Sequence, residues 1–189
     1  PLGQPLTHSM LIALDEALSM VVSSTEDLPG SPDGETTGWL LDIELEENTW
    51  YYWTAWAQDA YTTGEAMEPA RFFVNQYNEA PGVPGIDRPL DGSTATELEL
   101  VAIPPEDPDL DAVNLVFSLE FEDGTLISSA AVDPSDGLAA WAPPVDADDG
   151  DSFCWSVRAI DEHDLEGPAS EPSCFVIETT DLPPSAPDF

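Results

Sequence analysis

The chain has 189 residues, of which 39 are acidic and only three are basic, so its formal net charge at pH 7 is −36. This charge repels nucleic-acid phosphates and anionic lipid surfaces, which excludes both as partners. Hydrophobic residues make up 42% of the sequence, enough for two small cores. No stretch reaches the roughly 18 consecutive apolar residues of a membrane span, so we expect no membrane insertion.

The first part of the chain is predicted to form short β-strands, because apolar and polar residues alternate and Pro, Gly and Asp mark the breaks. Five strands are expected, at about residues 6–14, 18–24, 36–43, 49–58 and 70–75. Residues 10–22 resemble an amphipathic helix. They align, however, with a strand–turn–strand segment of the second part, so strands are predicted there as well.

The second part shows the same signals with two more strands in front. Seven strands are expected, at about residues 84–89, 95–102, 113–121, 125–132, 137–142, 151–160 and 172–178. Seven short strands in about 100 residues indicate a sandwich of two β-sheets. The sequence therefore predicts an all-β protein.

The two parts are copies of one another. Residues 50–81 align with residues 152–184, so that Tyr51 matches Phe153 and Trp53 matches Trp155. A repeat period of about 100 residues predicts tandem domains rather than a solenoid. We expect an incomplete sandwich over 1–78, a complete one over 79–180, and the start of a following domain or a linker over 181–189.

The first copy lacks counterparts of the first two strands, since Pro1 falls on Pro108 in the alignment. An open sheet edge and an uncovered side of the core are expected, and both favour strand addition. Residues 181–189 align with 78–86, so the tail of one molecule is a candidate to complete the first domain of the next. The alternatives are a retained separate fragment, cleaved at an Asp-Pro bond, and a boundary without structural meaning. Independently of these alternatives, the chain is expected to be part of a longer protein.

The strand over 49–58 carries a family resemblance. Leu45, Thr49 and Tyr51, followed by alternating apolar residues, resemble the Leu-x-x-x-Thr-x-Tyr pattern of fibronectin type III domains. The resemblance implies an immunoglobulin-like sandwich with a tyrosine corner, in which the Tyr51 hydroxyl bonds to nearby backbone. The second copy has Phe153 at this position, so no corner is expected there. The repeat also resembles tandem modules of large secreted or surface proteins of bacteria, which implies an extracellular location.

The two cysteines, Cys154 and Cys174, are expected to face outward on adjacent antiparallel strands. Their counterparts in the first copy, Tyr52 and Arg71, form a natural cross-strand pair. A disulfide between the cysteines is therefore predicted, with two reduced surface thiols as the alternative. A zinc site is not expected, because a closed site requires four ligands.

Acidic loops favour calcium as a cofactor, because carboxylate and carbonyl oxygens are the ligands that this ion prefers. Residues 75–81 are similar to the junction of cadherin-type repeats, a resemblance that implies calcium binding there. No loop has the EF-hand pattern, and the alternative for every carboxylate is a solvated acidic surface. The candidate ligands are Asp59, Asn75, Asn78, Glu79, Asp107, Asp109, Asp111, Asp161 and Asp164.

A strip of aromatic side chains is expected on the surface of the first domain. Such side chains stack on sugars or anchor protein contacts, and the alternative is packing against a neighbouring domain or a missing segment. The strip consists of Trp50, Tyr52, Trp56, Tyr61 and Phe73. No Gly-x-Ser-x-Gly, His-Glu-x-x-His or phosphate-binding loop is present, and neither histidine is expected to be catalytic, so enzyme activity is not expected.

These patterns together predict a non-enzymatic structural or adhesive spacer segment of a larger extracellular bacterial protein. Its expected partner is another protein or a second copy of the chain, bound at the open strand edge. The alternative is a carbohydrate-binding or accessory module of a secreted hydrolase, with a glycan as ligand.

Overall fold

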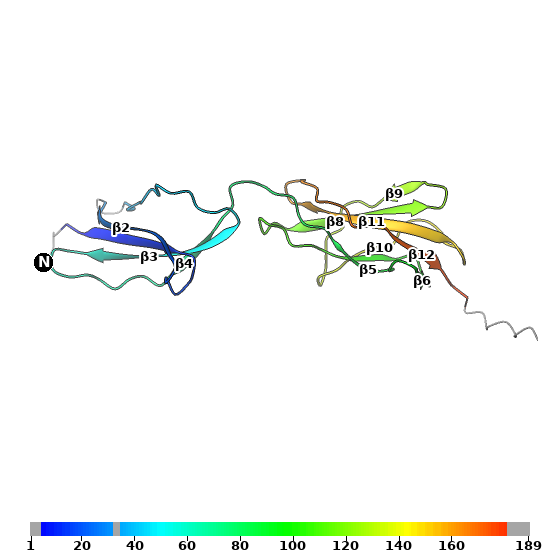
Figure 1. Ribbon diagram of the computed structural model, residues 1–189, viewed down its shortest axis with the longest axis horizontal. Coiled ribbons are helices and arrows are strands. Elements are labelled where there is room, and N and C mark those ends of the chain that lie inside the picture. The colour runs from blue at the N-terminus through cyan, green and yellow to red at the C-terminus, as the bar shows by residue number, and fades with distance from the viewer. Residues whose placement is uncertain (1–4, 32–34, 181–189) are drawn as a thin grey trace, which may run out of the picture. The chain divides into compact units, whose positions relative to one another are not determined.

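The computed structural model describes residues 5–31 and 35–180, and the chain forms two compact units, Pro1–Tyr77 and Asn78–Phe189 (Figure 1). The described residues form twelve β-strands and no helix. In that part of the chain, accordingly, no helix is long and apolar enough to cross a membrane. The prediction of an all-β protein is confirmed.

Unit 2 is a sandwich of two sheets. The smaller sheet has the order β10-β7-β5 and contains β5 (Gly85–Arg88), β7 (Leu100–Ile103) and β10 (Ala139–Trp141). The larger sheet has the order β6-β12-β11-β8-β9. It contains β6 (Ser93–Ala95), β8 (Val113–Phe121), β9 (Leu126–Ser128), β11 (Ser152–Asp161) and β12 (Ser173–Ile177). All its pairings are antiparallel except that of β6 with β12. This is the immunoglobulin-like architecture implied by the resemblance to fibronectin type III domains.

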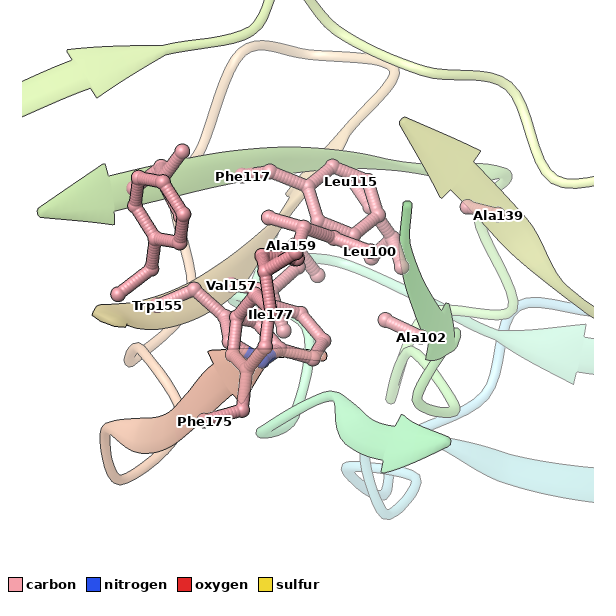
Figure 2. Packing of buried hydrophobic residues seen from close by; sticks show 12 residues of the cluster. Leu100, Ala102, Leu115, Phe117, Ala139, Trp155, Val157, Ala159, Phe175 and Ile177 are labelled. Atoms are coloured by element: carbon pink, nitrogen blue, oxygen red, sulfur yellow. The ribbon is translucent and has the colours of Figure 1, made fainter. Parts of the chain in front are cut away.

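The core of unit 2 lies between these sheets (Figure 2). Alternate residues of β8 and β11 face inward, and Phe117 and Trp155 stack there with ring centroids 5.9 Å apart. Leu100 and Ala102 of β7 close the opposite side of the same cluster. The indole Nε1 of Trp155 donates a hydrogen bond of 3.1 Å to the carbonyl oxygen of Pro89, so its polar atom is satisfied inside the core.

The described residues of unit 1 form one sheet, with the order β2-β1-β3-β4. Its strands are β1 (Thr7–Ala13), β2 (Val21–Pro29), β3 (Thr49–Gln58) and β4 (Ala70–Val74). The order reproduces that of β9-β8-β11-β12 in unit 2. The inward face buries Ile12, Tyr51 and Val74, and residues from the strand-free segment 35–48 pack on them: Trp39, Leu41 and Leu45.

The same backbone hydrogen bonds recur in both units, at positions related by the sequence alignment. The N–H of Gly64 donates to the carbonyl of Ala57 at 2.8 Å, and that of Gly167 donates to Ala159 at 2.9 Å. The two pairs differ by 103 and 102 positions, which reproduces the one-residue gap of the alignment. Each bond fixes the segment that follows the long central strand of its unit.

The tyrosine corner is present in unit 1 and absent from unit 2, as the resemblance implied. The Tyr51 hydroxyl accepts a hydrogen bond of 2.9 Å from the N–H of Glu46. In unit 2 the counterpart of that N–H belongs to Asp148, and it donates instead to the Asp151 carboxylate at 2.7 Å. A phenylalanine at position 153 is therefore compatible with the local hydrogen bonding.

Two strand predictions are wrong. Residues 36–43 form no strand, because the segment packs its apolar side chains on the core of unit 1 and pairs with no strand among the described residues. Residues 95–102 were expected as one strand, but the chain changes sheet there, so β6 pairs with β12 and β7 pairs with β5 and β10. The predictions for residues 1–4 and 181–189 lie outside the described residues.

Candidate functional site

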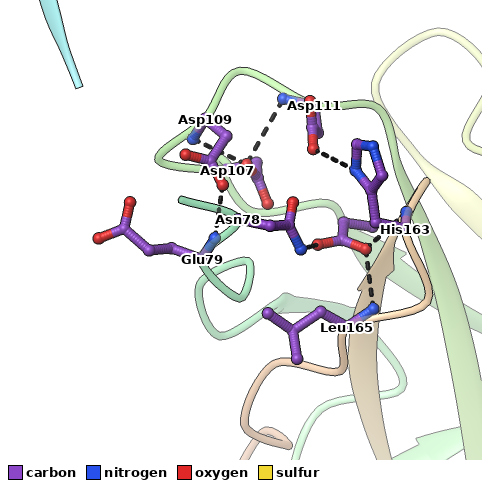
Figure 3. Close-up of polar contacts among 8 residues, drawn as sticks. Asn78, Glu79, Asp107, Asp109, Asp111, His163 and Leu165 are labelled. Atoms are coloured by element: carbon purple, nitrogen blue, oxygen red, sulfur yellow. Dashed lines mark hydrogen bonds and ion pairs between the residues drawn. The ribbon is translucent and has the colours of Figure 1, made fainter. Parts of the chain in front are cut away.

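Four aspartates gather at one end of unit 2, where the loop between β7 and β8 meets the end of β11 (Figure 3). Asp107, Asp109 and Asp111 occupy alternate positions of this loop, and Asp161 is the last residue of β11. Carboxylate oxygens of the three loop aspartates lie within 4.8 Å of one another. The same limit holds for ligand atoms of Asp111, Asp161 and His163, so Asp111 links the two groups. We call the four aspartates the acidic cluster.

Asp107 and Asp109 are buried and only partly hydrogen-bonded. Asp107 is 6% exposed, and its Oδ1 accepts a hydrogen bond of 2.8 Å from the N–H of Asp109. Asp109 is 4% exposed, and its Oδ2 accepts from the N–H of Glu79 at 2.6 Å. The other oxygens, Asp107 Oδ2 and Asp109 Oδ1, are buried and have no hydrogen-bond partner among the described residues.

Asp161 is held by the backbone that follows it. Its Oδ1 accepts from the N–H groups of His163 and Leu165, both at 2.8 Å, and its Oδ2 accepts from the Asn78 amide at 2.7 Å. Burial of the carboxylate raises its pKa, but the hydrogen bonds from Leu165, Asn78 and His163 outweigh burial and bring the pKa below its ordinary value. Asp161 is therefore a carboxylate fixed in its ionised form.

His163 is the basic side chain that touches the cluster. Its Nδ1 lies 3.0 Å from Asp111 Oδ2, and the hydrogen bond to Asp111 raises the pKa of the imidazole above its ordinary value. The imidazole is exposed, however, whereas the Asp111 side chain is largely buried. The sequence-based ligand set did not contain His163, and no feature of its local sequence distinguished it.

No arginine of the described part of unit 2 neutralises the acidic cluster. Arg88 pairs with Asp87 and Glu99, and Arg158 pairs with Glu166. Burial and the charges of the neighbouring loop aspartates both raise the pKa of Asp107, and hydrogen bonds from their N–H groups only partly offset this effect. The arrangement is an oxygen-rich pocket with more negative charge than its protein neighbours balance.

The remaining predicted ligands lie elsewhere. Asp59 is the counterpart of Asp161 in unit 1, and its Oδ1 accepts from the N–H groups of Tyr61 and Thr62, both at 2.8 Å. Asn75 is an exposed residue that follows β4. Asp164 is exposed and has a φ of 66°, in the turn that Asp161 caps. Their participation in a metal site stays a prediction.

Cys154 and Cys174 form the predicted disulfide. They are directly opposite one another on β11 and β12, with Cα atoms 4.0 Å apart. Their neighbours Phe153 and Phe175 face the core, so the bridge lies on the outer face of the sheet. Disulfides are typical of proteins that mature in an oxidising compartment.

The aromatic strip of unit 1 packs on itself in part. Trp50 lies opposite Phe73, with ring centroids 5.2 Å apart, and the Arg71 guanidinium lies 4.4 Å from the Trp50 ring centroid. Tyr52 is opposite Arg71 and is half-buried, as is Trp56. Tyr61 is 79% exposed in the loop after β3. Because Arg71 stacks on Trp50, one face of that ring is already in contact.

An apolar hollow of about 360 Å³ opens on the core side of the unit 1 sheet. Its lining comes from β1, β3 and β4 on one side and from segment 35–48 on the other: Met10, Leu11, Ile12, Trp39, Leu41, Trp53 and Phe72. The side of the unit 1 core that was expected to be uncovered is this face of the sheet. The contributions of Trp39 and Leu41 were missed, because a strand was expected where the chain forms none.

Comparison with known proteins gives weak likenesses only. No protein-family model and no curated protein matches the chain. Among solved structures, it is similar to the chicken interferon gamma receptor alpha chain, with 12% identity and a TM-score of 0.41 over 94% of this chain and 88% of that one. It is also similar to the FN1–FN3 domains of chicken CNTN1, with 14% identity and a TM-score of 0.44. That match covers 94% of this chain and 58% of the other.

At these values the likenesses carry no functional inference. The assignment to the immunoglobulin-like and fibronectin type III-like β-sandwiches rests on the strand order of unit 2 and on the alternation of its core residues.

Proposed function

We propose that the chain is a non-enzymatic structural and adhesive segment of a larger extracellular bacterial protein, acting as a spacer and a contact surface. The observation that carries this proposal is the apolar hollow of unit 1, lined by half-buried side chains such as Trp39, Trp53 and Phe72. Contiguous apolar surface of this kind favours contact with another polypeptide. The disulfide on unit 2 supports the extracellular location.

The partner that we propose for the hollow is residues 181–189 of a second copy. In unit 2 the corresponding side of the core is covered by the sheet of β5, β7 and β10, which contributes Leu100, Ala102 and Ala139. Residues 181–189 align with 78–86, the segment that leads into β5. Addition of such a segment to an open sheet would supply main-chain hydrogen bonds together with apolar side chains.

Sedimentation equilibrium of the full chain tests the contact. The average mass is expected to rise with protein concentration, and deletion of residues 181–189 or Met10→Glu is expected to leave a monomer. Met20→Glu is the matched control, since Met20 is 57% exposed and does not line the hollow. A full chain that stays monomeric up to high micromolar concentration would contradict self-association through this surface.

A further inference from the structure

The buried oxygens of the acidic cluster lack the partners that a buried carboxylate requires. Asp107 Oδ2 and Asp109 Oδ1 are each buried and form no hydrogen bond with the described residues, and their residues are only 6% and 4% exposed. Ionised carboxylates are found at such positions when they are paired, fully hydrogen-bonded or bound to a metal. We propose that the acidic cluster of unit 2 is a calcium-binding site, with Asp107, Asp109, Asp111 and Asp161 as ligands.

The negative charge around the site exceeds the positive charge that the described residues place beside it. Among the described residues, His163 is the one basic side chain beside the four carboxylates, and its exposed imidazole contacts Asp111. Arg88 and Arg158 are engaged in ion pairs with other carboxylates. A divalent ion placed among the three loop aspartates would use the two unpartnered oxygens and relieve the repulsion between them.

The chemistry of the donors selects calcium over other divalent ions. The candidate ligands are carboxylate oxygens, and calcium takes six to eight oxygen ligands in a flexible arrangement. Zinc favours tetrahedral sites rich in sulfur and nitrogen, which one exposed imidazole does not provide. Magnesium favours a tight octahedral shell that retains several waters, whereas these oxygens come from a loop and a strand end with varied orientations.

Unit 1 provides an internal comparison for the proposed calcium site of unit 2. Asp59 and Asp161 occupy equivalent positions, and each caps the turn that follows it: Asp59 accepts from the N–H groups two and three residues on, and Asp161 from those two and four residues on. The turn therefore requires an aspartate in both units, irrespective of any ion. At the positions aligned with Asp109 and Asp111, however, the first copy has Leu2 and Gln4. Asp109 and Asp111 therefore have no acidic counterpart in the first copy.

The test is calorimetric titration of the full chain with calcium chloride after removal of divalent ions by chelation. One saturable site is expected, and a hundredfold excess of calcium over Kd is expected to raise the melting temperature of unit 2 by roughly 10 °C or more. Asp109→Asn is expected to weaken calcium binding by at least about tenfold. The same substitution is expected to raise the melting temperature in chelator, because it removes one of three mutually repelling carboxylates.

Matched variants separate the site from general charge effects. Asp161→Asn is expected to reduce calcium affinity. Asp123→Asn removes the cap of the turn between β8 and β9 in the same unit and is expected to leave calcium affinity unchanged. Titrations at constant ionic strength with magnesium or sodium chloride measure screening of the acidic surface. Absence of a saturable calcium site, equal stabilisation by magnesium, or an Asp109→Asn affinity equal to that of the unmodified chain would each overturn the proposal. None of these measurements depends on self-association through unit 1.

Discussion

Replacement of Tyr51 by phenylalanine isolates the tyrosine corner of unit 1. Tyr51 is 2% exposed, and its hydroxyl accepts from the N–H of Glu46 at 2.9 Å. Tyr51→Phe keeps the buried ring and removes the acceptor. The net value of such a hydrogen bond is about 1 kcal/mol. For a unit of this size, the loss corresponds to a fall of about 4–8 °C in melting temperature.

The reverse substitution in unit 2 sharpens this prediction. Phe153 is 4% exposed, and the N–H that would face a new hydroxyl already donates to Asp151. Phe153→Tyr therefore buries a hydroxyl without a donor and is expected to cost about 1–3 kcal/mol. Differential scanning calorimetry of the full chain measures both variants. If Tyr51→Phe melts like the unmodified chain, or if Phe153→Tyr raises the melting temperature, the reasoning about these two corners is wrong.

Three further predictions address the bridge, the core and the turns. Replacing Cys154 and Cys174 together by alanine is expected to destabilise unit 2 by up to about 3 kcal/mol, because their sequence separation is 20; urea unfolding with and without reductant measures this. Leu115→Ala, at a fully buried position, is expected to cost about 2–5 kcal/mol in the same assay, and a loss below 1 kcal/mol would contradict the packing described. Hydrogen bonds, first among them that from the Met20 N–H, lower the pKa of Asp15 below 3.8. Asp15→Asn is therefore expected to destabilise unit 1 above pH 3.8, and this difference is expected to disappear as the pH falls through the folded-state pKa; a pH-independent difference would exclude the carboxylate as its cause.

Much of the fold was predictable because strand alternation and the internal repeat agree. The inward and outward faces of residues 49–58 and 151–160 follow directly from their period of two, and the repeat then placed Cys154 opposite Cys174. The change of sheet between β6 and β7 was not predictable. Alternation specifies which side chains face inward, but it does not specify with which strand a segment pairs.

The acidic cluster was predictable in its members rather than in its geometry. Alternate carboxylates at 107, 109 and 111 are visible in the sequence. They approach Asp161 because the loop between β7 and β8 and the last residue of β11 lie at the same end of the sandwich. The missing hydrogen bonds of Asp107 and Asp109 are a property of packing, which no local pattern reports. His163 joins the group only through the turn that Asp161 caps.

The position of the disulfide has a mechanical consequence. A pulling force on a tethered protein unfolds a domain by detaching its terminal strands, and in unit 2 the last strand is covalently joined to its neighbour β11. The chain between the two cysteines, which are 20 residues apart in sequence, would then stay closed in a loop on unfolding. The unfolded unit would therefore be about 70 Å shorter than a fully extended chain. At the corresponding positions unit 1 has Tyr52 and Arg71, which are not covalently joined. Under tension, unit 1 is therefore free to extend over its whole length, whereas unit 2 retains a closed loop until a reductant opens it.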